Sequence, residues 1–270
     1  MRIERFRGII EYSHKNKANM ERKVYYFYRD IGMDMDHTIR NFLQLVRPLF
    51  FANNYLVVEM PFKDKEIGAL CYKSDFMGYT FLNTSLPKVN MNFALCHEIY
   101  HAFYQKSSFE HQVELYMNEQ YYGHEEELAA NLFAGMVLMP EHHFKYMFQK
   151  FRKELGTEDE IIAVLAKLMS YFEVPYMAAL IRCYELKLLE SGDLLKELLY
   201  VDKDRIKKEF SELWLQEDIL QATKKDDFEK FVAHIQYKGL KYLENGYINE
   251  RTLRKALSNM NTLYRKIKGD

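Results

Sequence analysis

The sequence predicts an α+β fold, in which a small antiparallel sheet packs on a mostly helical domain and an all-helical extension follows at the C-terminus. Two observations lead to this prediction. Apolar residues recur at helical spacing over most of the 270 residues, and only 11 glycines and 5 prolines interrupt them. Between about residues 55 and 82, β-branched and aromatic residues form short runs that are typical of strands.

The predicted elements follow from these changes in period. The three expected strands cover residues 55–62, 67–72 and 77–82, and polar, turn-forming residues separate them. The expected helices cover about residues 16–30, 37–53, 91–106, 124–138, 141–154, 158–170 and 175–187, and a further helical block covers about 194–268. The change from sheet to helix near residue 87 is where we expect the functional site.

Two regions are predicted along the chain. Residues 1–190 would form one domain with a helical subdomain at about 140–190, and residues 191–270 would form a helical accessory or partner-binding region. In the second region, five apolar residues are spaced as the buried faces of amphipathic helices: Trp214, Phe228, Phe231, Ile235 and Leu240. The composition marks the joint only weakly, because no linker rich in proline, glycine or serine separates the two regions.

Composition and charge argue against nucleic acid as the main partner and against a membrane-spanning protein. The formal net charge of −1 gives no general basic excess, so we do not expect nucleic acid to be the main partner. The C-terminal end is nevertheless locally basic and leaves such a contact open for that block, through Arg251, Arg254, Lys255, Arg265, Lys266 and Lys268. No membrane span or secretory signal is evident, and three widely spaced cysteines fit a reducing compartment. We therefore expect a cytoplasmic protein that does not enter a membrane.

The segment from His97 to His101 reads His-Glu-x-x-His, a spacing that suits metal chemistry. On an α-helix, residues four apart return to within about 40° of the same face, so His97 and His101 can bind one cation. Glu98 is one step from the first histidine, beside the metal but off the ligand face. It therefore suits a general base that takes a proton from an attacking water molecule. By itself the motif also arises by chance on amphipathic helices.

A catalytic zinc ion normally has three protein ligands, so a third is needed. Glu127 is favoured, since its helix carries small residues that permit close approach to another helix. Asn131 shares the face of Glu127 and could orient a ligand histidine through a hydrogen bond. His111 and His124 stay open as weaker alternatives. The neighbouring acids Glu125 and Glu126 are better interpreted as solvated side chains that the helix dipole favours.

Together these motifs resemble the ImmA/IrrE family of metallopeptidases. The likeness rests on Phe93-Ala-Leu-Cys-His97-Glu-Ile-Tyr-His101, on Glu127-Leu-Ala-Ala-Asn131-Leu-Phe-Ala134 and on Leu138-Met-Pro140. It extends to the strand Gly78-Tyr-Thr-Phe-Leu-Asn83 and to a helical segment with Arg182 near its end, and it covers about residues 37–190. One position departs from the pattern, because Tyr100 stands where the family commonly has glycine, and we expect its ring to pack behind the helix.

The resemblance implies a zincin-like fold and one zinc ion per chain, bound by His97, His101 and Glu127 with Glu98 as general base. It also implies intracellular cleavage of a regulatory protein such as a helix-turn-helix repressor, in mobile-element or stress regulation. The alternative is a zinc-binding regulatory protein that acts through partner binding with little or no proteolysis. The presence of Glu98 favours the enzyme, because a purely structural zinc site has no need of a base.

Overall fold

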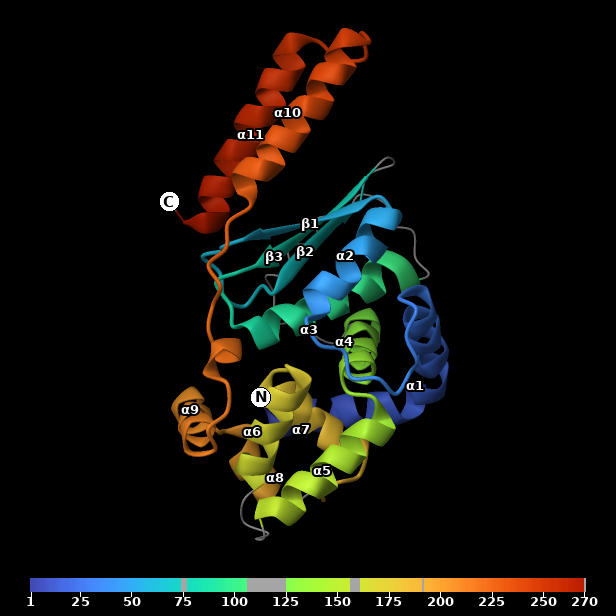
Figure 1. The fold of residues 1–270 in the computed structure, drawn as a ribbon, viewed down its shortest axis with the longest axis vertical. Coiled ribbons are helices and arrows are strands. Elements are labelled where there is room, and N and C mark those ends of the chain that lie inside the picture. The colour runs from blue at the N-terminus through green and yellow to red at the C-terminus, as the bar shows by residue number, and fades with distance from the viewer. Residues whose placement is uncertain (74–76, 106–124, 156–160, 191, 270) are drawn as a thin grey trace.

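The computed structural model describes residues 1–73, 77–105, 125–155, 161–190 and 192–269 (Figure 1). The strands are β1 (Tyr55–Met60), β2 (Ala69–Lys73) and β3 (Gly78–Asn83). The helices are α1 (Ile3–Asp30), α2 (Phe42–Ala52), α3 (Lys88–Ile99), α4 (Glu125–Leu138), α5 (Glu141–Leu155), α6 (Ile161–Phe172), α7 (Tyr176–Glu185), α8 (Asp193–Leu199), α9 (Lys203–Glu212), α10 (Phe228–Glu244) and α11 (Glu250–Lys268). A π-helical turn, Tyr100–Tyr104, extends α3, and a 3₁₀ turn, Glu217–Leu220, follows α9. The α+β class is confirmed.

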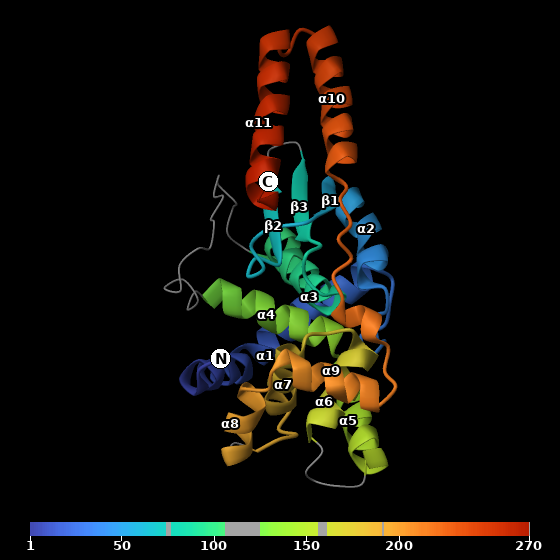
Figure 2. The same cartoon turned by 90° about the vertical axis from the view of Figure 1, so that its left-hand side faces the viewer.

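The elements stack in layers along the long axis of the molecule (Figures 1 and 2). The hairpin of α10 and α11 stands at one end, next to the sheet. Helices α2 and α3 lie beneath the opposite face of the sheet, α4 and α1 follow, and α5 to α9 close the far end. Period-two alternation explains the two faces of the sheet, since Thr80 and Leu82 are buried on the α3 side while Tyr79 and Phe81 contact Phe231 of α10.

The sheet is mixed, so the prediction of an antiparallel sheet is wrong for one of its two pairings. The strand order is β1-β3-β2, with β2 antiparallel to β3 and β1 parallel to β3. The connection across residues 61–68 lets β2 skip one position, and β3 then fills the gap beside β1. Apolar alternation specifies which side chains face the core but not which strands are neighbours, so the pattern alone did not reveal this order.

A buried asparagine stabilises the connection between the end of β3 and the start of α3. The side-chain oxygen of Asn83 accepts from the backbone N–H groups of Phe62 and Ser85, at 3.1 and 2.9 Å. Its amide nitrogen donates to the carbonyls of Asp64 and Ile67, at 2.9 and 2.8 Å. All of its polar capacity is used inside the protein, so Asn83 holds the 61–68 connection against the end of β3.

Several predicted helix limits change. Helix α1 begins at Ile3 rather than near residue 16, because its highly charged first half is stabilised by one buried face that includes Phe6 and Ser13. Helix α2 begins at Phe42 rather than near 37, after Asn41 in the left-handed conformation (φ 52°). The helix expected over about 91–106 begins at Lys88 as α3 and changes into the π-helical turn at Tyr100.

The C-terminal region differs from expectation in its buried residues. Trp214 and Leu240 were expected on buried faces, yet they are 95% and 43% exposed, whereas Phe228 is buried. Trp214 follows the end of α9 in the left-handed conformation (φ 53°), which turns its side chain away from the core. Core residues of α8 and α9 join the main hydrophobic core, among them Leu198 and Phe210. The domain boundary at residue 190 stays a prediction.

A strap, which we define as residues 221–227, connects this region to the sheet and leads into α10. The backbone N–H of Asp227 donates to the carbonyl of Glu59 on β1 at 2.7 Å, and the Thr84 hydroxyl donates to the carbonyl of Lys225 at 2.7 Å. The buried carboxylate of Glu59 pairs with Lys225 at 2.8 Å and with Arg47 of α2 at 2.6 Å. The strap thus fixes the base of the C-terminal hairpin (residues 228–268) against β1.

Within the described residues, no single helix is both long and apolar enough to cross a bilayer. One pair of helices, α6 and α7, passes the same length and composition test together, but the two meet at an angle of 106°.

We predict that Gly68→Ala destabilises the fold. A Cβ at Gly68 would lie 2.6 Å from the Cβ of Ala94, which is fixed on α3 and has no rotamer with which to move away. The expected loss is about 1–3 kcal/mol of unfolding free energy, measured by urea denaturation. Gly8→Ala is the matched control, because a Cβ there meets nothing within 4 Å and Gly8 lies inside α1. That control should leave stability unchanged or raise it by about 0.5–1 kcal/mol. Equal stability of the two variants would contradict the packing described.

Candidate metal centre

Three donor groups predicted as ligands converge between α3 and α4. The Nε2 atoms of His97 and His101 lie 3.0 Å apart. The two carboxylate oxygens of Glu127 lie 3.2 Å from the first Nε2 and 3.3 Å from the second. Residues 30 positions apart in the chain therefore direct their donor atoms to one point, and among the described residues this trio is the group with metal-binding spacing.

Local structure explains how the two histidines meet. His97 lies in the last turn of α3, and His101 lies in the π-helical turn that follows, where the backbone N–H of Gln105 donates to the carbonyl of Tyr100 at 2.9 Å. The wider turn changes the direction of the second imidazole relative to an ideal α-helix. Such π-helical insertions occur frequently at functional sites. The two side chains meet as i, i+4 spacing predicts, although the helix is not α-helical throughout.

The third donor depends on close packing between α4 and its neighbours. Ala130 and Ala134 are fully buried, and small side chains at these positions allow α4 to approach α3. The end of α4 is fixed by two buried donors. The Tyr28 hydroxyl donates to the carbonyl of Val137 at 2.8 Å, and Arg182 donates to that of Met139 at 3.1 Å. These contacts hold the helix that carries Glu127.

The hydrogen bonds around His101 determine which of its nitrogens is free. Gln105 donates its amide N–H to the Glu126 carboxylate, which can only accept. The amide oxygen of Gln105 therefore faces His101 and lies 2.6 Å from its Nδ1. The Nδ1 of His101 must therefore donate its hydrogen. In the neutral imidazole, Nε2 then keeps a lone pair that points at His97 and Glu127. This is the tautomer that a metal ligand requires.

His97 is oriented in the same way by Asn131. The Nδ1 of His97 lies 3.0 Å from the Oδ1 of Asn131, which comes from α4 one turn after Glu127. With Nδ1 donating, the Nε2 of His97 is also an acceptor. In these neutral tautomers, two imidazole lone pairs and a carboxylate face one another at 3.0–3.3 Å and repel one another unless a proton or a cation lies between them. A cation at their centre removes that repulsion.

The geometry also fits the size of such a cation. Zinc lies about 2.0–2.2 Å from nitrogen and carboxylate ligands, so two ligand atoms of a tetrahedral site lie about 3.3–3.6 Å apart. The separations of 3.0, 3.2 and 3.3 Å are at or slightly below the lower end of that range. The donor set of two imidazoles and one carboxylate is that of a catalytic zinc site with one open position.

The electrostatics of the metal-free side chains reflect the same proximity. Burial raises the pKa of Glu127, but hydrogen bonds and charge from both histidines outweigh burial and hold its pKa far below the ordinary range. Burial lowers the pKa of His101, yet the Glu127 hydrogen bond, the Glu98 charge and the Gln105 hydrogen bond together raise its pKa to about 9. Without a metal, a proton therefore occupies this point, and metal binding would release it.

Glu98 lies beside the trio rather than within it. It is half-buried, and burial raises its pKa while the positive charge of the two histidines opposes that shift. Burial is the main cause of the raised pKa of the Cys71 thiol on β2, and the charge of Glu98 raises that pKa further. Glu98 is therefore close enough to the donor trio and to Cys71 for its charge to act on both, as expected of a base that takes a proton from an attacking water molecule.

The remaining histidines and acids near the motif were expected to be weaker ligands or solvated side chains. His111 and His124 lie outside the described residues. Glu125 is exposed, as expected, but the solvated role expected for Glu126 is wrong, because it holds Gln105. Sequence reasoning missed Gln105 altogether. Its place four residues after His101 was the available signal, since it can then reach that imidazole from the next turn.

Tyr100 packs behind the helix, as expected from its sequence context. Its side chain is buried, with its ring 5.8 Å from that of Phe133, and its hydroxyl accepts from Lys23 of α1 at 2.9 Å. The bulky residue therefore fills space between α1 and α4.

Comparison with known families agrees with this geometry. Residues 53–184 match the family model Peptidase_M78, described as the IrrE N-terminal-like domain. The match includes β1 to β3 and every residue of the donor trio, and it confirms the resemblance to the ImmA/IrrE family. No curated protein and no solved structure matches the chain. A metallopeptidase family implies a metal, and the donor trio is where the residues fit one.

We predict that Gln105→Leu weakens metal binding without unfolding the protein. Losing the acceptor for the Nδ1–H of His101 frees the imidazole to rotate, so zinc affinity should fall by about 10- to 100-fold in a chelator competition assay. Gln44→Leu is the control, because Gln44 is exposed on α2, and it should bind zinc like the wild type. Wild-type affinity in the Gln105→Leu variant would show that this hydrogen bond does not support the site.

Proposed function

We propose that this chain, whose residues 53–184 belong to the Peptidase_M78 family, is a zinc-dependent endopeptidase that hydrolyses peptide bonds in a protein substrate. The observation that carries the proposal is the convergence of His97, His101 and Glu127 at 3.0–3.3 Å with Glu98 beside them. A site built only to hold a metal has no use for a fourth, non-ligating carboxylate at this position.

Zinc bound by the trio would supply a Lewis acid that polarises the scissile carbonyl and acidifies a water molecule. The protein's own groups do the rest. Glu98 accepts the proton of the attacking water and later delivers it to the leaving amine. Asn131 and Gln105 keep both imidazoles in the tautomer that leaves Nε2 free.

The sheet offers an explanation for how a peptide would reach this site. β1 is covered along its edge, since Arg47 donates to the carbonyl of Val57 at 3.1 Å and Asp227 donates to that of Glu59 at 2.7 Å. β2 is the other edge strand, and among the described residues it pairs only with β3. An extended substrate can add to such an edge through backbone hydrogen bonds. Because Glu98 lies next to β2, the scissile bond would then be close to the base.

The substrate is proposed from the family resemblance. The ImmA/IrrE likeness favours a regulatory protein of the cytoplasm, such as a helix-turn-helix repressor, as the protein that is cleaved. Binding along β2 would require an extended segment, which in a folded repressor is a linker or a terminus. The competing proposal, a zinc-binding regulator without proteolytic activity, predicts the same ligands and differs only in whether Glu98 is used.

We predict that Glu98→Gln retains zinc but loses turnover by a factor of about 10² to 10⁴ or more, because the amide cannot accept the proton. Zinc content is measured by elemental analysis, and turnover by mass spectrometry of a peptide library digested with the zinc-loaded protein. Glu125→Gln removes an exposed carboxylate at the start of α4 and should leave turnover unchanged. Full turnover in the Glu98→Gln variant would remove Glu98 from its role. A zinc-loaded wild type that cleaves neither the library nor a repressor would favour the regulatory alternative.

A further inference from the structure

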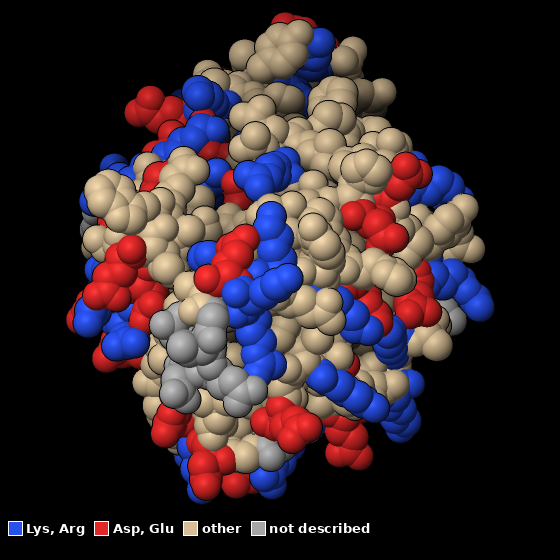
Figure 3. All heavy atoms as spheres, turned by 60° about the horizontal axis from the view of Figure 1, so that its bottom comes forward, with Lys and Arg blue, Asp and Glu red and all other residues tan. Residues whose placement is uncertain are grey.

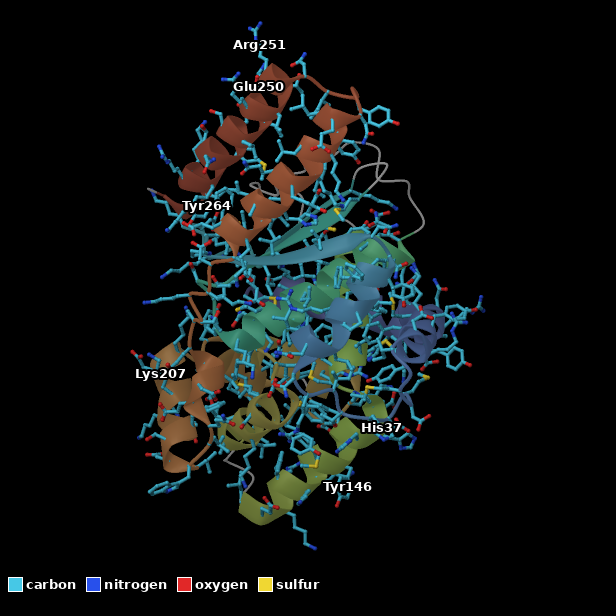
Figure 4. All side chains as sticks on the ribbon, turned by 45° about the horizontal axis from the view of Figure 1, so that its top comes forward. His37, Tyr146, Lys207, Glu250, Arg251 and Tyr264 are labelled. Carbon is cyan, nitrogen blue, oxygen red and sulfur yellow. The ribbon has the colours of Figure 1, made fainter. Side chains whose placement is uncertain are left out.

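The C-terminal hairpin (residues 228–268) projects past the sheet and presents one face of α11 to solvent (Figures 1 and 2). Figure 4 shows Glu250 and Arg251 at the end of the hairpin distant from the sheet and Tyr264 near its base. The Tyr264 ring stacks on Phe228 with centroids 3.8 Å apart, and a Cβ on Gly239 would lie 2.3 Å from the Leu253 side chain. α10 and α11 are therefore closely packed, and their shared seam buries Leu253, while Leu263 of α11 stays 57% exposed.

The charge of the hairpin is opposite to that of the rest of the chain. Residues 228–268 contain nine lysines and arginines and three glutamates, a net charge of +6, and the whole chain has −1, so the remaining residues have −7. On the face formed by the far-end helices, basic and acidic side chains are interspersed (Figure 3). The near-neutral total therefore conceals a strongly basic hairpin attached to an acidic body.

Within the hairpin, the basic side chains lie on the outer face of α11. Helical spacing puts Leu253, Leu257 and Tyr264 on the seam and five cationic residues on the opposite side. All five are exposed: Arg251, Arg254, Lys255, Arg265 and Lys266. They span about 22 Å of helix, at a rise of about 1.5 Å per residue.

Most of this charge is not neutralised inside the protein. Arg254 pairs with Glu250 at 3.0 Å, but both side chains are highly exposed. In the described part of the chain, no carboxylate lies within ion-pair distance of Arg251, Lys255, Arg265 or Lys266. Arg251 also lies in the first turn of α11, where the positive end of the helix dipole makes a cation unfavourable. Such an arrangement destabilises the free hairpin and is relieved by an anionic partner.

The chemistry of the face indicates which anionic partner fits. A membrane-binding helix inserts a continuous apolar face into the lipid, whereas α11 packs its apolar face on α10 and leaves Leu263 as its one exposed large apolar residue. A protein interface normally centres on aromatic or aliphatic anchors. The centre of this face holds Ser258, Asn261 and Thr262 instead, all exposed, between the two basic ends. Hydroxyl and amide groups between cations are the set that contacts a phosphodiester backbone.

We propose that the outer face of α11 binds the phosphate backbone of double-stranded nucleic acid without sequence preference. The two basic ends, Arg251 to Lys255 and Arg265 to Lys266, contact phosphates, and the polar residues between them supply hydrogen bonds. This goes beyond the proposed peptidase activity and does not depend on it, because α10 packs on the face of the sheet opposite α3 through Phe231. Binding here leaves the donor trio accessible.

The test uses the full chain and a fluorescein-labelled 24-base-pair DNA duplex of arbitrary sequence, with fluorescence anisotropy measured from 50 to 200 mM salt. The wild type should bind, and its affinity should fall steeply with salt. The variant Arg251→Gln, Lys255→Gln, Arg265→Gln, Lys266→Gln should bind about 100-fold more weakly at 50 mM salt. The slope of its log affinity against log salt should be smaller by about 3 to 4, because each phosphate that a cation neutralises adds about 0.9 to that slope.

The matched control removes four exposed lysines from α5 and α9: Lys150→Gln, Lys153→Gln, Lys203→Gln and Lys207→Gln. It changes the net charge by the same amount and should bind the duplex within about threefold of the wild type. Circular dichroism and thermal unfolding should match the wild type for both variants, because every substituted residue is exposed. An RNA duplex of the same length tells whether one form of double helix is preferred, and binding to either supports the proposal.

Three results would overturn the proposal: no binding of either duplex at 50 mM salt, equal binding by the hairpin variant and the wild type, or equal weakening in the control variant. Vesicles containing 30% phosphatidylserine and light scattering of the protein alone identify the competing partners. Vesicle binding or self-association that requires the four hairpin residues, without duplex binding, would assign this face to a membrane or to the acidic body of a second copy.

Discussion

The structure depends on one electrostatic constraint, the meeting of two imidazole lone pairs and a carboxylate at 3.0–3.3 Å. These groups repel one another unless a proton or a metal lies between them, so the protein must hold them in place. It does so from outside the trio. Asn131 and Gln105 fix the imidazoles, Glu126 fixes Gln105, and buried donors anchor the end of α4. The pattern of contacts is that of a preorganised site, in which supporting groups set the geometry before a ligand arrives.

The sheet divides the molecule into two surfaces with different chemistry. On the side of α3, the charge of Glu98 reaches Cys71 of β2, and β2 is an edge strand that pairs only with β3 among the described residues. On the other side, α10 covers Tyr79 and Phe81, and the strap holds the hairpin to β1 through Glu59. The same small sheet thus packs against the candidate catalytic centre on one face and against the basic C-terminal hairpin on the other. Because the strap covers β1 and not β2, the two surfaces do not compete for one edge.

Much of the centre could be predicted from sequence, because the spacing of His97 and His101 and of Glu127 and Asn131 depends only on helix geometry. Gln105 and Glu126 were not predicted, since their roles depend on a π-helical turn and on contact between helices far apart in sequence. Likewise, alternation predicted the strands but not their order, which depends on how far the 61–68 connection reaches. Trp214 shows the limit of periodicity, because a left-handed residue after α9 turned an apparently buried position outward.

The composition of the metal centre can be measured by X-ray absorption at the zinc edge, on full-length protein loaded with one equivalent of zinc. We expect two imidazole nitrogens and at least one carboxylate oxygen at about 2.0–2.2 Å, with the carboxylate contribution absent in Glu127→Gln and retained in Glu98→Gln. Sulfur ligands, or a zinc environment that Glu127→Gln leaves unchanged, would contradict the assignment of His97, His101 and Glu127 as the ligands.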